Sequence, residues 1–254
     1  MIDYMDESTI IQKARAGFDE DFSKKNYMEQ RTGDAVHLQK ILSCLNIVPH
    51  SKILDLGTGS GFLAFPMAQD NSESIVVGLD IAVRTLEQNR KKASMMRLSN
   101  LNFVDYDGIN FPFEDGTFNY VVTRYALHHF PDIEKTFTEI NRVLKRGGVL
   151  FVSDPTPNEV DNIRFVDTFM QMKDDGHIRF YLKSEFVELT GKHGFQLVDS
   201  FASEIRFPSN RTEKYLQIAG SIDEKIIDSY EIEVNQGEIY ITEQVNNLMF
   251  LKRL

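Results

Sequence analysis

The strongest chemical signal in the chain is a glycine-rich segment, Gly57-Thr-Gly-Ser-Gly61, which directly follows a short apolar run over 52–56. Glycines between the end of a strand and the start of a helix let a ligand approach the backbone closely. The unpaired N–H groups at a helix start favour an anionic group there. The segment therefore predicts a binding loop for a small molecule with an anionic group such as a carboxylate.

The residues around this loop narrow the class of ligand. A dinucleotide fingerprint needs a third glycine where Phe62 stands, and no Gly-Lys-Ser/Thr of a nucleoside-triphosphate loop follows. Asp55 lies two positions before the first glycine, where a carboxylate would repel a pyrophosphate but suit an amino group. Asp80 ends a second apolar run, and a carboxylate there can accept hydrogen bonds from both hydroxyls of a ribose. The pattern predicts a ligand with an amino acid at one end and a ribose at the other.

A pair of histidines, His128 and His129, is the second chemical signal, and we expect the pair to open the helix that follows the predicted strand over 118–124. Histidine titrates near neutrality and can take a proton from a hydroxyl, an amine or an activated carbon. Adjacent residues on a helix point about 100° apart, so at most one of the two can face a reacting group. His128 is the first candidate for a general base, with packing or capping as the alternative role for either histidine. Arg124 and Tyr125 are further candidates for a substrate pocket, with structural roles as the alternative.

Two other polar groups carry weaker signals. Asp174, Asp175 and His177 form a charged segment that is most typical of an exposed turn between helices, and no Cys/His spacing indicates zinc. We therefore expect no metal site. Tyr27 and Arg31 are candidates for a lid over the ligand, with a solvated helix face as the alternative.

Alternating strands and helices must position these residues. Apolar runs predict strands over 52–56, 74–80, 101–105, 118–124 and 148–153. Helical spacing of apolar residues predicts helices over 62–69, 82–96 and 133–144, with Arg146-Gly-Gly148 as a glycine C-cap. This alternation favours an α/β fold, a doubly wound parallel sheet with helices on both faces.

The flanking regions do not show this alternation. The pattern of residues 1–45 predicts helix and turn. The C-terminal third predicts helices, followed by strands that close the sheet in the antiparallel sense. The predicted elements of that third are a helical stretch over 156–193, a strand over 195–207, a helix over 211–230, and strands over 237–242 and 248–251.

Composition excludes several classes of protein. The 28 basic and 38 acidic residues among 254 give a net charge of −10, which argues against nucleic acid as a partner. One cysteine, Cys44, cannot form an internal disulfide, so an oxidising compartment is not indicated. No apolar run approaches about 18 residues, so no membrane span is expected. We expect a cytoplasmic enzyme or small-molecule binder.

Several segments together resemble a known family, the class I S-adenosylmethionine-dependent methyltransferases. The matching segments, in chain order, are Asp55-x-Gly-x-Gly-x-Gly, Asp80, Asp107-Gly108, FPFEDGTFNYVV over 111–122, TRYALHHFPD over 123–132 and RVLKRGG over 142–148. Within the family the chain is most similar to small-molecule enzymes of the ubiquinone/menaquinone biosynthesis C-methyltransferase-like group. The resemblance covers residues 45–155. The segment after the fourth strand departs from the quinone enzymes, so a quinone substrate is not carried over.

The resemblance implies S-adenosylmethionine as cofactor and a Rossmann-like, seven-stranded, mostly parallel sheet with an antiparallel C-terminal strand and helical cap insertions. It implies one methyltransferase domain over 1–254. Within it, 1–45 would be an N-terminal helical cap, 46–155 the donor-binding core, and 156–254 the cap helices and sheet-closing strands.

The resemblance also assigns a role to each donor-binding position. The positions are Asp55, Gly57, Thr58, Gly59, Asp80, Ile81, Asp107, Gly108 and Thr123. The glycine loop would cradle the methionyl part, with Asp55 near its amino group. Asp80 would hold the ribose and Ile81 would pack on the adenine. Asp107 would accept from the adenine amino group, the Gly108 N–H would meet a ring nitrogen, and Thr123 would line the sulfonium. Each aspartate has a rival role as a strand-end or turn residue.

The leading hypothesis is methyl transfer from S-adenosylmethionine to a small-molecule acceptor. The segment Thr123-Arg-Tyr-Ala lacks the Asn/Asp-Pro-Pro-Tyr/Phe pattern of nucleic-acid base methyltransferases. One alternative is an NAD-dependent oxidoreductase, against which Phe62 and the absence of a Tyr-x-x-x-Lys dyad count. Another is a catalytically inactive donor-binding sensor or partner protein. A homodimer is left open.

Overall fold

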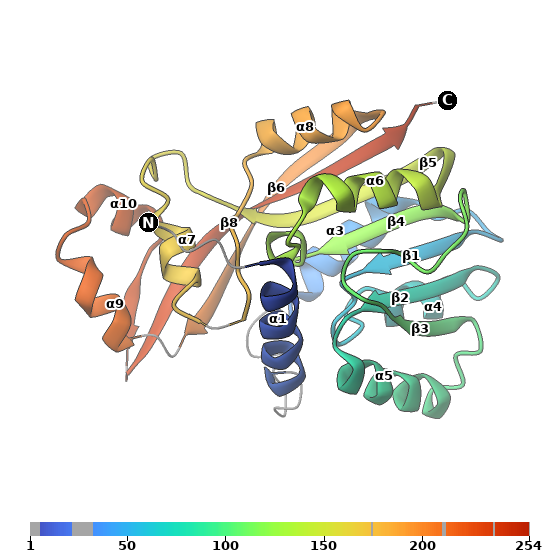
Figure 1. Ribbon diagram of the computed structural model, residues 1–254, viewed down its shortest axis with the longest axis horizontal. Helices are drawn as coiled ribbons and strands as arrows, with labels where there is room; N and C mark the ends of the chain where they lie inside the picture. The colour runs from blue at the N-terminus through green and yellow to red at the C-terminus, as the bar shows by residue number, and fades with distance from the viewer. Residues whose placement is uncertain (1–5, 22–32, 174, 210–211, 236, 254) are drawn as a thin grey trace.

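The computed structural model describes residues 6–21, 33–173, 175–209, 212–235 and 237–253 (Figure 1). The helices are α1 (Glu7–Asp21), α3 (Ala35–Leu45), α4 (Ala64–Asp70), α5 (Val83–Met95), the 3-10 helix η1 (Leu127–His129), α6 (Ile133–Val143), α7 (Phe165–Met170), α8 (Lys183–Lys192), α9 (Thr212–Ala219) and α10 (Glu224–Ser229). The strands are β1 (Lys52–Leu56), β2 (Ile75–Asp80), β3 (Leu101–Asp105), β4 (Phe118–Arg124), β5 (Leu144–Thr156), β6 (Phe195–Ser209), β7 (Glu233–Asn235) and β8 (Glu238–Lys252).

The strands form one sheet in the order β3-β2-β1-β4-β5-β8-β6. Neighbours from β3 to β5 are parallel, and β8 runs antiparallel to both β5 and β6. This confirms the predicted α/β fold, with seven strands along the path and an antiparallel C-terminal strand. The predicted count is one short, because the three-residue β7 pairs with β8 off the path and makes an eighth strand.

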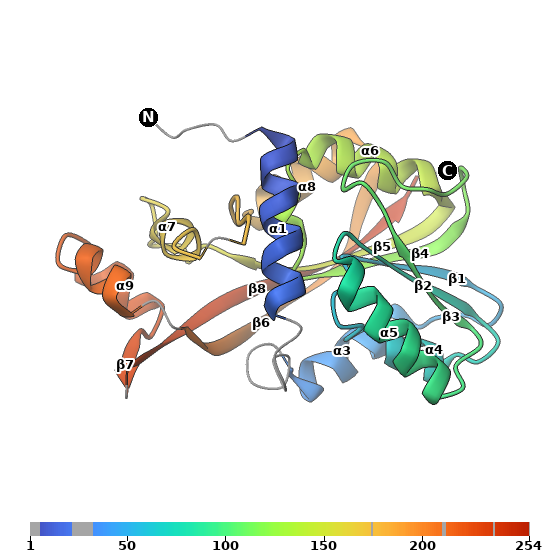
Figure 2. The same cartoon turned by 60° about the horizontal axis from the view of Figure 1, so that its bottom comes forward.

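Helices cover both faces of the parallel part of the sheet, as Figures 1 and 2 show. Side chains alternate between faces along each strand. Leu54 and Leu56 pack in the cluster that includes α6 and α8, whereas Ile53 packs with α3, α4 and α5. Because both faces are covered, the central strands are apolar almost throughout.

The strand order reverses between β1 and β4, and this point positions the functional loops. In the register of the sheet Leu56 lies beside both Leu79 of β2 and Thr123 of β4. The segments that follow β1, β2 and β4 therefore leave the sheet side by side at its carboxyl edge. Open α/β sheets bind their ligands at such a point.

The long strands β6 and β8 extend beyond the parallel sheet and carry a cap. The pairing of β8 with β5 ends at Gln244, and the preceding part of β8 pairs with β6 and β7. An apolar cluster on this extension joins α7, α9 and α10 to the two strands. Helix α1 crosses the front of the molecule between this cap and the core (Figures 1 and 2).

The predicted C-cap after the 133–144 helix is wrong. Helix α6 ends at Val143, and Leu144 begins β5, so Arg146-Gly-Gly148 lies inside the strand. Gly147 has φ +70°, and the pairing of β4 with β5 shifts register between Phe118 and Tyr120. A glycine at positive φ suits such an irregularity in a strand as well as it suits a helix end.

Three other predicted elements differ from the structure. The stretch 156–193 holds only the short α7 and α8, separated by irregular chain, and 211–230 is broken into α9 and α10 around Gly220. The two late strands are one continuous β8. Residues 243–247 lay between the two predicted strands, but Asn247 is fully buried in β8 and pairs with His37 (2.7 Å) and Ser203 (2.9 Å).

No helix in these described ranges is long and apolar enough to cross a membrane.

Candidate functional site

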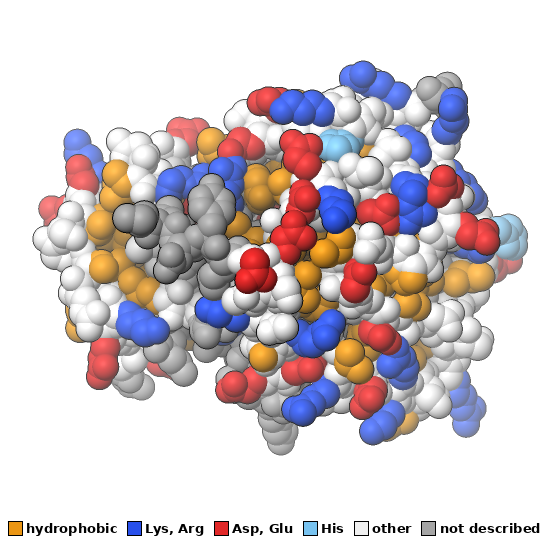
Figure 3. Space-filling model, in the orientation of Figure 1, with side chains coloured by type: hydrophobic (Ala, Val, Ile, Leu, Met, Phe, Trp, Pro, Cys, Tyr) orange, Lys and Arg blue, Asp and Glu red, His pale blue; other side chains and the backbone are white. Residues whose placement is uncertain are grey.

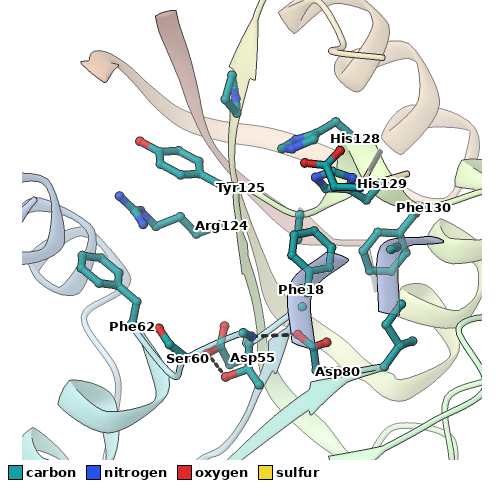
Figure 4. Close-up of a pocket in the computed structure, with 18 of the residues that line it drawn as sticks. Phe18, Asp55, Ser60, Phe62, Asp80, Arg124, Tyr125, His128, His129 and Phe130 are labelled. Atoms are coloured by element: carbon teal, nitrogen blue, oxygen red, sulfur yellow. Dashed lines mark hydrogen bonds between the residues drawn. The ribbon is translucent and has the colours of Figure 1, made fainter. Parts of the chain in front are cut away.

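A cavity opens at the carboxyl edge of the sheet, between the glycine loop, α1 and the cap (Figure 4). Many predicted site residues line it, from segments that are far apart in the sequence. The lining predicted residues are Asp55, Gly57, Thr58, Gly59, Asp80, Ile81, Gly108, Arg124, Tyr125, His128 and His129. The fold therefore brings the donor-loop residues and the histidine pair to one cavity.

The glycine loop turns sharply because Gly57 adopts φ +69°. Its backbone N–H and that of Thr58 both donate to the Leu79 carbonyl oxygen, at 2.9 and 3.1 Å. A β-carbon at Gly57 would lie 2.5 Å from the β-carbon of Ala126, which leaves no space for a side chain. The position thus needs glycine for both its dihedral angle and its close approach to the segment after β4.

We expect Gly57→Ala to destabilise the protein more than the matched change Gly116→Ala. Both glycines have positive φ, which costs an alanine about 1–2 kcal/mol. Gly116 has open space around it, whereas Gly57 adds a steric clash worth about 1–3 kcal/mol. Urea unfolding of the two variants measures the difference. Equal losses of unfolding free energy would show that the contact with Ala126 relaxes freely.

Asp55 is buried beneath the loop. One of its carboxylate oxygens accepts a hydrogen bond from the Thr58 hydroxyl at 2.7 Å. Burial raises the pKa of Asp55 to about 7, the Thr58 hydrogen bond opposes this rise, and the nearby Asp80 charge adds to it. The carboxyl group is therefore poised to change its charge near neutral pH.

Asp80 lies at the end of β2 and closes the loop from the other side (Figure 4). Its Oδ2 accepts from the Gly59 N–H at 2.8 Å, and its Oδ1 accepts from the Ala82 N–H at 2.9 Å. Asn89, which the sequence analysis missed, supports the same loop by donating to the Gly59 carbonyl at 2.7 Å. A carboxylate offers about four acceptor sites, so Asp80 can still accept a hydrogen bond from a ligand hydroxyl.

Two predicted donor residues do not line the cavity. The Asp107 carboxylate is engaged in its own turn, where it accepts from the backbone N–H groups of Ile109 and Asn110 at 2.7 Å and from the Asn110 side chain at 2.7 Å. Thr123 is buried inside β4, and its hydroxyl finds no hydrogen-bond partner within the described chain. The neighbours Tyr106 and Ala126 line the cavity instead.

His128 and His129 lie in η1, a single 3-10 turn, rather than at the start of α6 as predicted. His128 Nδ1 lies 2.9 Å from Oδ1 of Asp154, a fully buried residue of β5. Burial lowers the pKa of His128, but the carboxylates of Asp154, Glu243 and Asp175 together outweigh it, so the pKa is raised. His129 packs edge-on against Phe18 of α1, with ring centroids 4.8 Å apart.

Arg124 and Tyr125 line the cavity on the side of the glycine loop. The Arg124 guanidinium lies over the rings of Phe62, at 4.1 Å, and Tyr125, at 3.9 Å. Tyr125 has φ +54°, a strained backbone conformation for a bulky residue. Backbone strain of this kind is concentrated at active sites and ligand-binding sites, where the surrounding structure holds the residue in place.

Helix α1 contributes to the site, although none of its residues was predicted to line it. Ile11, Ala14 and Phe18 of α1 line the cavity, and Arg15 fastens the helix by donating to the Ile81 carbonyl at 3.0 Å. The scattered apolar residues of the N-terminal segment were the available signal. The proposed lid residues Tyr27 and Arg31, and Asp174 of the charged segment, lie outside the described residues.

Comparison with known proteins decides the family. The model of a methyltransferase domain family matches residues 47–204, which is more than half of the chain. The chain belongs to this family. It is an S-adenosylmethionine-dependent methyltransferase, as the resemblance implied, and S-adenosylmethionine is its cofactor.

Individual methyltransferases agree with this assignment. The chain is 25% identical over 198 residues to the uncharacterized methyltransferase YcgJ of Bacillus subtilis, covering 73% of this chain and 78% of YcgJ. The YcgJ crystal structure superimposes with a TM-score of 0.76 at 22% identity, covering 87% of this chain and all of that one. A demethylmenaquinone methyltransferase of Staphylococcus saprophyticus is 33% identical over 123 residues, which span 46% of this chain and 52% of that enzyme.

Proposed function

We propose that this methyltransferase moves the methyl group of S-adenosylmethionine to a small molecule bound in the same cavity. One observation carries the proposal: the cavity is continuous from the donor loop to the cap. Asp55 and Asp80 line one end, while Phe180 and Phe207 of the cap region line the other. His128 and His129 line the wall between them.

The donor end of the cavity offers partners for the two polar parts of S-adenosylmethionine, the amino acid and the ribose. We infer that the glycine loop and Asp55 receive the amino-acid part and that Asp80 receives the ribose hydroxyls. Ile81, Tyr106 and Gly108 would then surround the adenine, since all three line the cavity. Asp107 and Thr123 remain proposals with less support, because neither lines the cavity and the Asp107 carboxylate already holds its own turn.

The acceptor end of the cavity positions the acceptor and offers it a nitrogen lone pair. In the reaction an acceptor lone pair forms a bond to the methyl carbon, and the bond from carbon to sulfur breaks with its electron pair remaining on sulfur. Because the sulfonium is already activated, in-line placement of the acceptor supplies much of the rate. The Asp154 carboxylate holds His128 through Nδ1, so a neutral His128 presents its Nε2 lone pair. That lone pair can take the acceptor's proton or coordinate a cation that assists its loss.

The surface and composition suit a small acceptor. On the face in Figure 3 acidic and basic side chains are interspersed rather than gathered into a basic patch. The net charge is −10. We infer that nucleic acid is not the acceptor, that residues 1–254 act as one domain, and that the enzyme works in the cytoplasm, where its single cysteine needs no partner.

Donor binding should release a proton near neutral pH. Because the pKa of Asp55 is raised to about 7, part of the population is protonated without donor. A cationic amino group beside Asp55 favours the carboxylate and lowers its pKa, so donor affinity should rise from about pH 6 to about pH 7.5. Calorimetry in buffers of different ionisation enthalpy measures the released proton. Asp55→Asn should remove this dependence, and proton uptake by the wild type would contradict the assigned role.

A direct binding experiment tests the donor end. Isothermal titration should show micromolar-order binding of S-adenosylmethionine and of its demethylated product, and no binding of NAD or ATP. NAD binding without a response to the sulfonium compound would overturn the proposal. Tight donor binding without transfer to any acceptor would favour the sensor alternative.

A further inference from the structure

Three histidines come together at one wall of the cavity, although His177 is distant from the other two in the sequence. His128 and His129 line the wall, and His177 is buried next to them. His128 and His129 come from η1, and His177 comes from the segment between α7 and α8. One ring nitrogen from each lies within 4.8 Å of those of the other two. The ring centroids are 4.3 Å apart for His128 and His129, 5.3 Å for His128 and His177, and 5.9 Å for His129 and His177.

In each ring, one nitrogen is hydrogen-bonded to an oxygen atom. Asp154 Oδ1 lies 2.9 Å from His128 Nδ1, and Asp167 Oδ1 lies 3.1 Å from His177 Nε2. The backbone of Gly176 hydrogen bonds the ring of His129. Carboxylate and carbonyl oxygens only accept, so the held nitrogen carries the hydrogen, and in a neutral ring the other nitrogen keeps a lone pair.

The second nitrogen of two of these rings receives no hydrogen bond from the described residues. His129 Nδ1 and His177 Nδ1 are buried and find no hydrogen-bond partner in the part of the chain that the structure describes. The His177 side chain is 0% exposed. Buried polar atoms are rarely left unsatisfied, and each such atom calls for an explanation such as an ion. A cation between the rings would satisfy the three lone pairs together.

We propose that His128, His129 and His177 bind one divalent transition-metal ion of the zinc class. Imidazole nitrogen suits zinc and its neighbours, and catalytic zinc sites use three protein ligands with one open position. A carboxylate or carbonyl behind each ring is the arrangement that orients histidine ligands. Nitrogens on one zinc ion lie about 3.4 Å apart, so the rings need to approach one another by somewhat more than 1 Å.

The open position of this ion faces the cavity, because His128 and His129 both line it. Asp175 lines the same wall and adds negative charge, which Lys173 partly offsets at 3.0 Å. If the proposed function holds, the acceptor is a molecule with a metal-binding oxygen, nitrogen or sulfur atom. The ion then lowers the pKa of that group and aids loss of its proton. This consequence rests on the proposed function, whereas metal binding itself does not.

Metal titration of the full chain tests the site without donor or acceptor. Protein stripped with a chelator is titrated with Zn²⁺ by calorimetry and with Co²⁺ by visible absorption. We expect one ion per chain and an affinity loss of at least about 100-fold in His177→Gln and His129→Gln. His193→Gln is the matched control, because His193 pairs with Glu134 at 2.8 Å outside the cluster, and it should bind as the wild type does.

X-ray absorption of the zinc-loaded wild type tests the site without any variant protein, and we expect three imidazole ligands. No saturable binding, undiminished binding by folded His177→Gln, or fewer than three imidazoles would overturn the site. Full transfer activity in chelator with no bound metal would also overturn it and leave the proposed function and a base role for His128 intact. Metal binding without any methylated acceptor would instead leave the site and defeat the proposed function.

Discussion

His128→Ala lowers the rate of methyl transfer about 10²–10⁴-fold and leaves donor affinity nearly unchanged, because it removes the Nε2 lone pair that either takes the acceptor's proton or binds the proposed ion. The residue lines the cavity, whereas the proposed donor contacts come from the glycine loop and Asp80. Steady-state kinetics with the identified acceptor, and calorimetry with S-adenosylmethionine, measure the two quantities separately.

His193→Ala is the matched control for this change, since it removes a histidine that pairs with Glu134 and does not line the cavity. A thermal melt by circular dichroism shows whether each variant is folded. A folded His128→Ala enzyme that loses less than about tenfold in rate would show that placement alone drives the reaction. Loss of donor affinity equal to the loss of rate would place His128 on the donor side instead.

Asp80→Ala lowers affinity for S-adenosylmethionine roughly 5- to 150-fold, because two ribose hydroxyls lose their acceptor at a cost of about 1–3 kcal/mol. The change also frees the Gly59 N–H, which Asp80 accepts at 2.8 Å, so the loop loses a support. Asp80→Asn keeps one acceptor oxygen and should lose less. Titration calorimetry of both variants gives the order of effects.

Asp105→Ala separates ribose recognition from a general effect of strand-end carboxylates. Asp105 ends the neighbouring β3 and is exposed, paired with Arg90 at 3.2 Å, and does not line the cavity. It should bind the donor as the wild type does. Normal donor binding by a folded Asp80→Ala protein would show that Asp80 only closes the loop.

The donor half of the site could be predicted because its signals are local. The loop after β1 and Asp80 at the end of β2 each follow an apolar strand, and parallel strands bring their carboxyl ends to one edge. Asp107 shows the limit of this reasoning, since an aspartate before a glycine also suits a turn, and here the carboxylate closes one.

The acceptor half could be predicted only in part. His128 and His129 follow β4 closely and were candidates, whereas other residues come from distant segments. His177 reaches η1 only because its loop folds back, with the Ile178 N–H donating to the His128 carbonyl at 2.9 Å. The continuity of β8 was missed for a different reason. Glu243 and Asn247 are buried in the strand, whereas polar side chains are more typical of exposed positions.

Transfer of a labelled methyl group tests the central claim most directly. The wild-type protein is incubated with methyl-labelled S-adenosylmethionine and a fractionated extract of small metabolites, with Asp80→Ala as the impaired control. We predict label in a small molecule, an equal amount of demethylated donor, and a much slower reaction in the variant. Donor binding without any labelled small molecule, or label appearing only in macromolecules, would contradict the account.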